Sequence, residues 1–491
     1  MFLSLGGVIF YGLWKARGSN TTDQYLRAGR TMPWYAMGLS IMATQASAIT
    51  FISTTGQAYV DGMRFVQFYL GLPIAMVILS VTAVPIFHRA NVYTAYEYLE
   101  QRFDSKVRLL VSILFLIQRG LAVGLALSAP AIVLTAILGW SAEVTTIVMG
   151  ITVILYTAMG GVKAITWTDF YQMLIMFFGL GIALLTAIWL LPSEVGFLGA
   201  LEVAGGAGKI NPIVTAFSWN DRYNLWSGIF GGMFLALSYF GCDQSQVQRY
   251  LTGSSIAQSR LSLLFNAVAK LPMQFIILLT GCIVFAFFTY NQPPLLFQKH
   301  AQSSIEKSAE YPELKARYDA AFAKRRAAAE NISRDKTAYQ QAAAEFEIVR
   351  QDGSKLAERI LDEKGFNDTN YIFLNFVTTY LPVGLVGLVI SAILAAAMST
   401  ISGEINSLAT VSIVDVYRRY LKKEADDRHY LWAARIATIF WGVYAVVTAQ
   451  FARNMGSLVE AVNLLGSLFY GGILGVFVLA IGKVPLATAS A

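Results

Sequence analysis

Long apolar runs alternate with short polar connections along almost the whole chain. A helix needs ~20 predominantly apolar residues to cross a bilayer core, and most of these runs reach that length. They number about eleven, and together they predict an all-α membrane protein. The predicted spans are 2–14, 33–57, 64–87, 107–138, 142–161, 169–192, 223–248, 261–290, 383–416, 430–452 and 456–482.

Composition supports a membrane protein. Of the 491 residues, 56% are hydrophobic and 14% are charged, whereas soluble domains carry about 25% charged residues. The net charge of +7 could indicate a nucleic-acid partner, but the basic residues cluster at the ends of apolar runs, which is an orientation signal. We therefore expect a protein that spans the lipid bilayer and binds no nucleic acid. Its location would be the plasma membrane (the bacterial inner membrane), with the N-terminus outside.

Residues 291–370 interrupt the apolar pattern with a segment rich in Ala, Lys, Glu and Arg. Apolar residues recur there every four positions among good helix formers, which predicts helices. We expect an extracytoplasmic helical hairpin that turns near Asn331, followed by a short lid helix at 371–381. The predicted domains are membrane helices over 1–290, the hairpin insert over 291–370, and the lid helix with further membrane helices over 371–491.

A polar patch lies in the middle of the predicted span 383–416. Ser399, Ser402 and Asn406 are three and four residues apart and share one helix face. At membrane depth such side chains must face protein, water or an ion. Neutral oxygens suit a hard monovalent cation better than a transition metal. Small polar residues also let helices approach closely, and both interpretations remain open at this point.

A second polar island covers 38–56, where small and hydroxyl residues, with Gly56, favour a locally unwound helix. Unwound backbone frees carbonyl groups that can coordinate Na⁺ in the middle of a membrane. Tight helix packing is the alternative.

A third island, 156–172, contains Asp169 at the start of a predicted span. Its carboxylate would cap that helix and complement the helix dipole. Alternatively, it would draw a cation from its site toward the cytoplasm.

A fourth island, 238–249, places Gly241 among aromatic residues, directly before polar residues, and predicts another helix break. Lys270, in the predicted span 261–290, must pair, extend to the membrane surface, or bind an anionic or hydroxylated group. No Gly-rich phosphate loop, His/Cys cluster or Ser/His/Asp arrangement occurs in the sequence. We therefore expect a protein that is not an enzyme.

Taken together, these islands resemble the sodium/solute symporter family, which includes sodium–glucose, sodium–proline, sodium–iodide and sodium–monocarboxylate transporters. The motifs that carry the resemblance are GGVKAITWTD (160–169), QVQRYL (246–251) and AAAMSTIS with INSLATVSIVD (395–415). The family resemblance implies a LeuT-like inverted-repeat (5+5) helical core, preceded here by one extra N-terminal span. The first, sixth and eighth core helices would be 33–57, 223–249 and 383–416.

The same resemblance implies where sodium binds. The ligands would be the carbonyls of Ala43, Ala46 and Ala396 and the hydroxyls of Ser399 and Thr400. A second sodium site, present in some members, would use Asp169 and Ser402. Those members supply a further hydroxyl at the position of Gly403, and Glu404 also departs from the family pattern.

For the solute, similarity to the sugar branch implies a cavity lined by Thr50, Gln67, Phe68, Tyr69, Tyr239 and Lys270. Tyr239 would stack on the solute as an inner gate. Tyr69 and Ala236 replace a glutamate and an asparagine of the sugar transporters, and segment 95–103 looks closer to the anion and vitamin branch. Sugar and carboxylate solutes both remain open.

We therefore expect a secondary active symporter that uses Na⁺ to import a small polar solute by alternating access. We expect it to be a monomer or a weak homodimer. The alternative is a membrane sensor that uses the same fold to bind a solute. Such sensors usually carry a signalling domain, and only PLATASA follows Gly482-Lys483-Val484 in this sequence, so the symporter is favoured.

Overall fold

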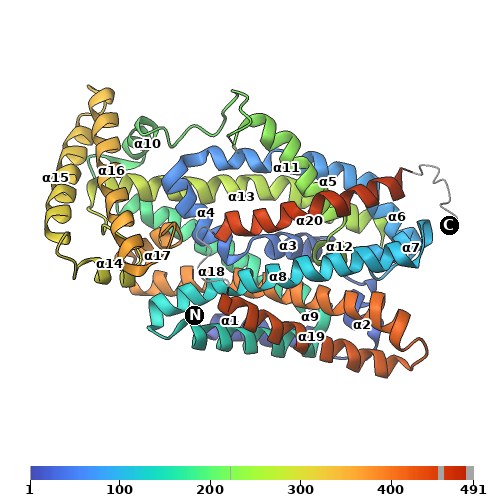
Figure 1. Cartoon of the computed structure of the whole chain (residues 1–491). Coiled ribbons are helices and arrows are strands. Elements are labelled where there is room, and N and C mark those ends of the chain that lie inside the picture. Colours follow the sequence, from blue (N-terminus) through green and yellow to red (C-terminus); the bar gives the residue numbers. More distant parts are fainter. Residues whose placement is uncertain (1, 222, 452–457, 483–491) are drawn as a thin grey trace.

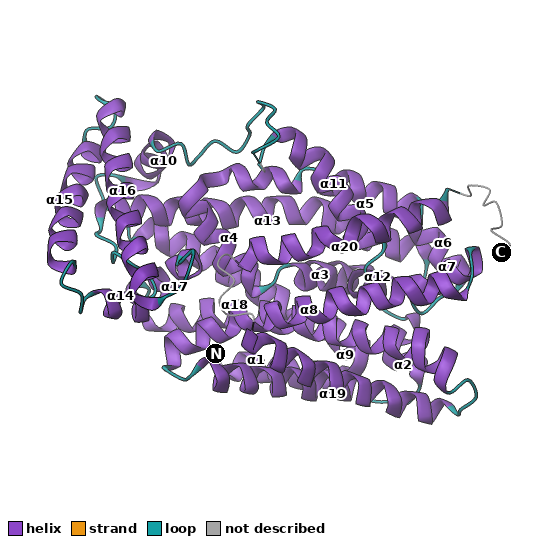
Figure 2. Cartoon of the chain, viewed as in Figure 1, coloured by secondary structure: helices purple, strands orange, loops and turns teal. Residues whose placement is uncertain are grey.

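The structure is a computed structural model that describes residues 2–221, 223–451 and 458–482. All regular elements of these residues are helices. The first half contains α1 (Phe2–Lys15), α2 (Thr22–Arg27), η1 (Ala28–Arg30), α3 (Trp34–Gln45), α4 (Ala48–Asp61), η2 (Gly62–Tyr69), α5 (Leu72–Val81), α6 (Ala83–Ala90), α7 (Ala95–Arg102), α8 (Ser105–Leu138), α9 (Ala142–Trp189), α10 (Gly196–Gly206), η3 (Ser227–Gly231) and α11 (Gly232–Gly241). The second half contains α12 (Gln244–Leu251), α13 (Ile256–Tyr290), α14 (Lys299–Ile305), α15 (Tyr311–Glu330), α16 (Lys336–Leu361), α17 (Thr369–Tyr380), α18 (Val383–Val411), η4 (Ser412–Leu421), α19 (Asp427–Phe451) and α20 (Leu458–Ile481). The long helices run side by side in an elongated bundle, and α15 and α16 stand across one end of it (Figure 2).

Seven helical runs in the described part of the chain are long and apolar enough to cross a membrane. They are Ala48–Ala90, Ser105–Thr135, Ala142–Trp189, Ile256–Tyr290, Val383–Leu421, Asp427–Phe451 and Leu464–Ile481. Each of the eleven predicted spans coincides with one or more helices, but the counts differ. The reasons are that α1 and α3 are short, that α11 and α12 are separate pieces, and that two predicted spans form the single helix α9.

Helix α18 is deeply buried over most of its length, and it packs against α9, α8, α19, α3 and α12. Every residue from Val389 to Val411 is buried. Small residues make this close packing possible, because they let two helix backbones approach each other. A methyl group added at Gly179 of α9, for example, would lie 2.5 Å from the Cβ of Ala392.

Two helices beside α18 are interrupted. Helix α3 ends where Ala46 leaves helical geometry (ψ 75°), and α4 begins after the extended residue Ser47. The locally unwound helix predicted within 38–56 is therefore confirmed, with the break at Ala46 and Ser47. Gly56 lies inside α4, where the absence of a side chain leaves room for the backbone of Thr369 in α17. The second break falls directly after Gly241, between α11 and α12, as predicted.

Helix α9 covers two predicted spans in 48 residues and is kinked at Gly161, where the backbone is not helical. Gly161 lies at the junction with a positive φ of 57°, which glycine adopts without strain. Its missing side chain also leaves room for the carbonyl of Tyr25 from α2. Asp169 lies beyond this kink, fully buried inside the second part of α9, and the prediction that it caps a helix start is wrong.

The insert forms α14, α15 and α16 at one end of the bundle, and the turn predicted near Asn331 lies between α15 and α16 (Figure 1). It has its own apolar core and is held against the membrane helices by buried cations. Arg350 pairs with Asp368 at 2.9 Å. Arg325 donates to the Phe288 carbonyl of α13. The insert is thus a docked cap on the bundle.

Gly161 provides a test of this packing. Replacement of Gly161 by Ala would force a side chain into a positive-φ position and against the Tyr25 carbonyl, so we expect a loss of about 2 kcal/mol in unfolding free energy. Gly181 of the same helix has open space around it, and Gly181→Ala should be neutral or slightly stabilising. Thermal unfolding of the detergent-purified variants measures both effects. Equal melting temperatures for the two variants would contradict the structural role assigned to Gly161.

Candidate functional site

The polar patch of α18 meets the broken end of α3. The Ser399 hydroxyl is 2.9 Å from the Ala43 carbonyl oxygen and 3.0 Å from the Ala396 carbonyl oxygen, within hydrogen-bond distance of both. The Thr400 hydroxyl donates to the Thr44 carbonyl at 3.0 Å. Residues some 350 positions apart in sequence therefore meet through oxygen atoms.

The break explains why these carbonyls are available. The last turn of a helix has carbonyl groups with no helical N–H partner. Ala46 is fully buried at this end, and the N–H of Thr50 donates to the Ser47 carbonyl instead of to Ala46. Backbone oxygens from the end of α3 and hydroxyls of α18 are hard, neutral donors, which fit an alkali cation carried as a substrate.

Asp169 and Ser402, the residues expected at a second sodium site, lie beside a buried arginine. The Asp169 carboxylate accepts a hydrogen bond from Ser40 at 2.6 Å and lies 3.9 Å from an Arg249 guanidinium nitrogen. The Ser402 hydroxyl donates to the Ser399 carbonyl at 3.1 Å. Arg249 is 1% exposed, so a full positive charge is held close to Asp169.

Gly403 leaves the space that this arginine fills. A methyl group at position 403 would clash with the Arg249 guanidinium. The lack of a side chain, and hence of a hydroxyl, at position 403 is therefore what allows Arg249 to lie there.

Of the residues expected to contact the solute, Lys270 and Tyr69 lie together. Lys270 is fully buried, and its Nζ is 5.9 Å from the centroid of the Tyr69 ring. Element η2, which carries Tyr69, packs against both α11, which carries Tyr239, and α13. Three predicted residues from η2, α11 and α13 thus share one neighbourhood.

The other three predicted residues have different surroundings. Gln67 is saturated by backbone groups, since its amide donates to the Tyr223 carbonyl at 2.9 Å and accepts from Val214 N–H at 2.8 Å. It therefore fastens η2 to the loop before α11. Phe68 stacks on Phe65 with ring centroids 5.7 Å apart. Thr50 is buried in the first turn of α4.

A buried charge cluster that the sequence did not predict joins α8, the α11–α12 break, α18 and α20. Arg119 donates to Asp243 at 2.6 Å, to Glu404 at 2.8 Å and to the hydroxyl of Tyr470 at 2.7 Å. Its guanidinium also lies 5.0 Å from the centroid of the Tyr239 ring. The one available signal was an arginine inside an apolar run, because such a cation must be paired.

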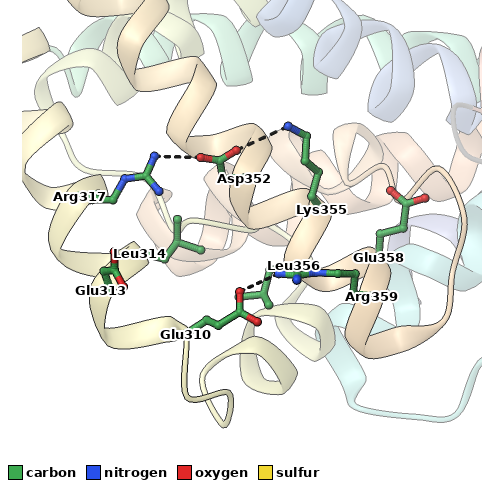
Figure 3. Close-up of a pocket in the computed structure, with 9 residues that line it drawn as sticks. All are labelled: Glu310, Glu313, Leu314, Arg317, Asp352, Lys355, Leu356, Glu358 and Arg359. Atoms are coloured by element: carbon green, nitrogen blue, oxygen red, sulfur yellow. Dashed lines mark hydrogen bonds and ion pairs between the residues drawn. The ribbon is translucent and has the colours of Figure 1, made fainter.

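A charged pocket between α15 and α16 is a second candidate (Figure 3). It is lined by Glu310, Glu313, Leu314, Arg317, Asp352, Lys355, Leu356, Glu358 and Arg359. Its cations already pair with its acids, for example Arg317 with Asp352 at 2.9 Å and Arg359 with Glu310 at 2.7 Å. These exposed surface pairs indicate a solvated face of the insert rather than a solute site.

Two interrupted helices beside a continuous polar helix form the architecture of a broken-helix membrane transporter. The comparisons with known proteins agree with this class. The chain belongs to the sodium:solute symporter family, whose family model matches residues 25–308 and 360–483. The unmatched residues 309–359 hold most of α15 and α16, so the insert lies largely outside the family core.

Similar proteins include several sodium-coupled transporters. The chain is 28% identical over 466 residues to the rabbit (Oryctolagus cuniculus) sodium-dependent multivitamin transporter, covering 94% of this chain and 62% of that protein. It is 27% identical to a sodium/sialic acid symporter of Aliivibrio fischeri, covering 98% of this chain and 82% of that protein. This chain therefore spans less than two thirds of the length of the multivitamin transporter.

A solved structure of a Na⁺-coupled sialic acid symporter in a substrate-bound, outward-open state has a similar fold. Its TM-score is 0.74 at 25% sequence identity, and the match covers 98% of this chain and 85% of that chain. The similar fold extends over nearly the whole bundle.

The charge cluster generates a stability prediction. Arg119→Met would leave Asp243 and Glu404 buried without their cation, so we expect a loss of ~3–5 kcal/mol in unfolding free energy. Arg317→Met removes an ion pair whose arginine is 51% exposed and should cost about 0–1 kcal/mol. Thermal unfolding in detergent compares the two variants. A similarly small loss of unfolding free energy in both variants would show that the Arg119 charge cluster contributes little to stability.

Proposed function

We propose that the protein is a secondary active symporter, which couples the entry of Na⁺ to the import of a small polar organic solute by alternating access. The observation that carries this proposal is the meeting of the Ser399 hydroxyl with the carbonyls of Ala43 and Ala396. An oxygen cluster between a broken helix and its neighbour at membrane depth is how such transporters hold their coupling ion. Family membership supports the same function.

The proposed sodium ligands are Ala43, Ala46, Ala396, Ser399 and Thr400. Alternating access requires that the ion bind at an interface that opens and closes. Helices α3 and α18 are separate elements, joined by hydrogen bonds from Ser399 to the Ala43 carbonyl and from Thr400 to the Thr44 carbonyl. Sodium would replace the hydroxyl–carbonyl hydrogen bonds by ion–oxygen contacts. Its binding would therefore fix the relative position of α3 and α18.

The membrane potential supplies part of the driving force. One charge that moves through 100 mV gains about 2.3 kcal/mol, which alone corresponds to ~50-fold accumulation of a neutral solute. The sodium gradient adds to this value. A single sodium ion per transport cycle is therefore sufficient for concentrative uptake.

We further propose that one sodium ion is coupled, with Arg249 as the positive charge that neutralises Asp169. The support is the buried pair at 3.9 Å and the position of Arg249 against Gly403. A sodium ion held by Asp169 and Ser402 would compete with this guanidinium for the same carboxylate. The Na⁺ dependence of the single site would be hyperbolic.

The proposed solute contacts are Tyr69, Tyr239 and Lys270, with Thr50 and Phe68 nearby. Tyr239 would close the solute off as an inner gate. In support, its hydroxyl accepts a hydrogen bond from Gln246 at 2.8 Å, which links α11 to α12 across the second break. We propose that Gln67 acts through the loop that it holds rather than through direct solute contact.

We propose that the insert faces the outside and the opposite end of the bundle faces the cytoplasm. Basic residues near α2, α6, α7 and η4 support this orientation, because cytoplasmic connections are enriched in Lys and Arg. The basic residues concerned include Arg27, Arg89, Arg102, Arg418 and Arg419.

The sodium site can be tested in proteoliposomes. The double variant Ser399→Ala with Thr400→Ala removes two oxygen ligands, so the Na⁺ concentration for half-maximal uptake should rise at least about tenfold. Ser391→Ala is the matched control, because this hydroxyl of the same helix bonds to the Gly387 carbonyl of its own helix. An unchanged sodium dependence in the double variant would show that the ion binds elsewhere.

The stoichiometry gives a separate prediction. If Arg249 takes the place of a second sodium ion beside Asp169, uptake measured against Na⁺ concentration should have a Hill coefficient of roughly 1. A coefficient clearly above this value in the wild-type protein would mean that a second sodium ion binds cooperatively, and that the role proposed for Arg249 is wrong.

A further inference from the structure

Helix α13 carries three buried polar side chains, Asn266, Lys270 and Gln274, at intervals of four residues. This spacing places them one above another on a single helix face. All three are fully buried. Within the described residues, the Lys270 amine, both amide atoms of Gln274 and the Asn266 carbonyl oxygen have no hydrogen-bond partner.

This polar face of α13 (Asn266, Lys270 and Gln274) borders the broken helix. Helix α13 packs against α3, α4, α5 and η2. On the broken helix, Gln45 Oε1 and Thr54 Oγ1 are also buried without a partner among the described residues. Unsatisfied polar atoms therefore gather on both sides of the α3–α4 break.

Lys270 differs from the buried arginines of the bundle. Arg108, Arg119 and Arg249 each lie beside a buried carboxylate, whereas no described acidic group acts on Lys270. An ammonium in a membrane interior is strongly unfavourable unless an anion or several acceptors surround it. Full burial also excludes the alternative in which Lys270 reaches the membrane surface. None of the described residues supplies a counter-ion, and a bound anion would provide one.

We propose that this polar face binds the carboxylate of an organic anion that also carries a hydroxyl or carbonyl group. Lys270 would hold the carboxylate, while Gln274 and Asn266, each ~6 Å away along the helix axis, would bond polar groups on either side. The proposal rests on the symport function proposed above and assigns its solute to the hydroxy- and oxocarboxylates. A neutral sugar would leave the ammonium unpaired.

Asn266 and Gln274 would set the specificity. An amide can both donate and accept, so it recognises a hydroxyl or a carbonyl but offers nothing to a plain alkyl chain. A buried amide left without a partner disfavours the analogue that lacks the polar group. The face should therefore prefer a hydroxylated carboxylate over a simple one of similar size.

Two pairs of labelled probes test the inference in proteoliposomes with an inward Na⁺ gradient. The pairs are D-glucuronate with D-glucose and L-lactate with L-lactamide, in which the members differ at the carboxylate. We expect at least one acid to enter at least about tenfold faster than its neutral partner. Lys270→Met should remove this preference, and Lys270→Arg should keep part of it because the charge remains. A separate comparison uses labelled L-lactate and propionate, which lacks the hydroxyl. Gln274→Leu should reduce the preference for lactate over propionate.

The controls separate this inference from the underlying function. Lys355→Met, at a lysine that is 70% exposed on the insert, should behave as wild type. Stabilisation of Lys270→Met by Na⁺ in thermal unfolding shows that the variant folds and still binds sodium. Equal entry of acid and neutral probes, or wild-type selectivity in Lys270→Met, would overturn the inference. The inference would also be overturned if Na⁺ stabilised the wild-type protein but the protein transported none of the four probes. That result would not contradict the proposed function. A wild-type protein on which sodium has no effect would overturn both.

Discussion

The hydroxyl of Ser399 faces the carbonyl end of α3, and much of the structure depends on this contact. A helix that ends inside a membrane leaves carbonyl groups where no water can satisfy them. Here the hydroxyls of Ser399 and Thr400 lie against the carbonyls of Ala43 and Thr44. The break in α3–α4 and the polar patch of α18 therefore require each other. Their shared oxygen atoms can serve either as hydrogen-bond partners or, with an ion between them, as ligands.

The buried charges divide into paired and unpaired groups. Arg119 links the second helix break to α18 and α20, because it holds both Asp243 and Glu404. Arg249 similarly joins α12 to Asp169 of α9. These pairs tie the elements around the proposed sodium site to one another, and a movement of α18 would disturb the pair of Arg119 with Glu404. Lys270 differs from these arginines because it has no such partner among the described residues, and this difference is the basis of the ligand role proposed for it.

The sequence predicted the elements that local chemistry determines. Gly241 followed by polar residues predicted a break, and the break falls there. The island 38–56 predicted a locally unwound helix, and the break falls within it at Ala46 and Ser47. Gly56 itself lies inside α4, where its missing side chain leaves room for α17. The prediction that Asp169 caps a helix was wrong, because the kink in α9 falls earlier, at Gly161.

The site was only partly predictable for a related reason. Ser399 and Ala43 are brought together by tertiary packing, and only the family resemblance paired them in advance. Arg119 was missed because its partners lie more than 120 residues away, and an isolated arginine in an apolar run does not reveal which acid it meets. The roles predicted from the sequence for the sodium-binding and solute-binding residues stay predictions.

Thallium, a heavy monovalent cation with strong anomalous scattering, offers the most direct view of the ion. Crystals grown in sodium and then soaked with Tl⁺ should show an anomalous peak enclosed by the carbonyls of Ala43, Ala46 and Ala396 and the hydroxyls of Ser399 and Thr400. This peak should weaken as Na⁺ is added back. A Na⁺-sensitive peak beside Asp169, or elsewhere, with none between α3 and α18, would contradict the coupling of ion binding to these two helices.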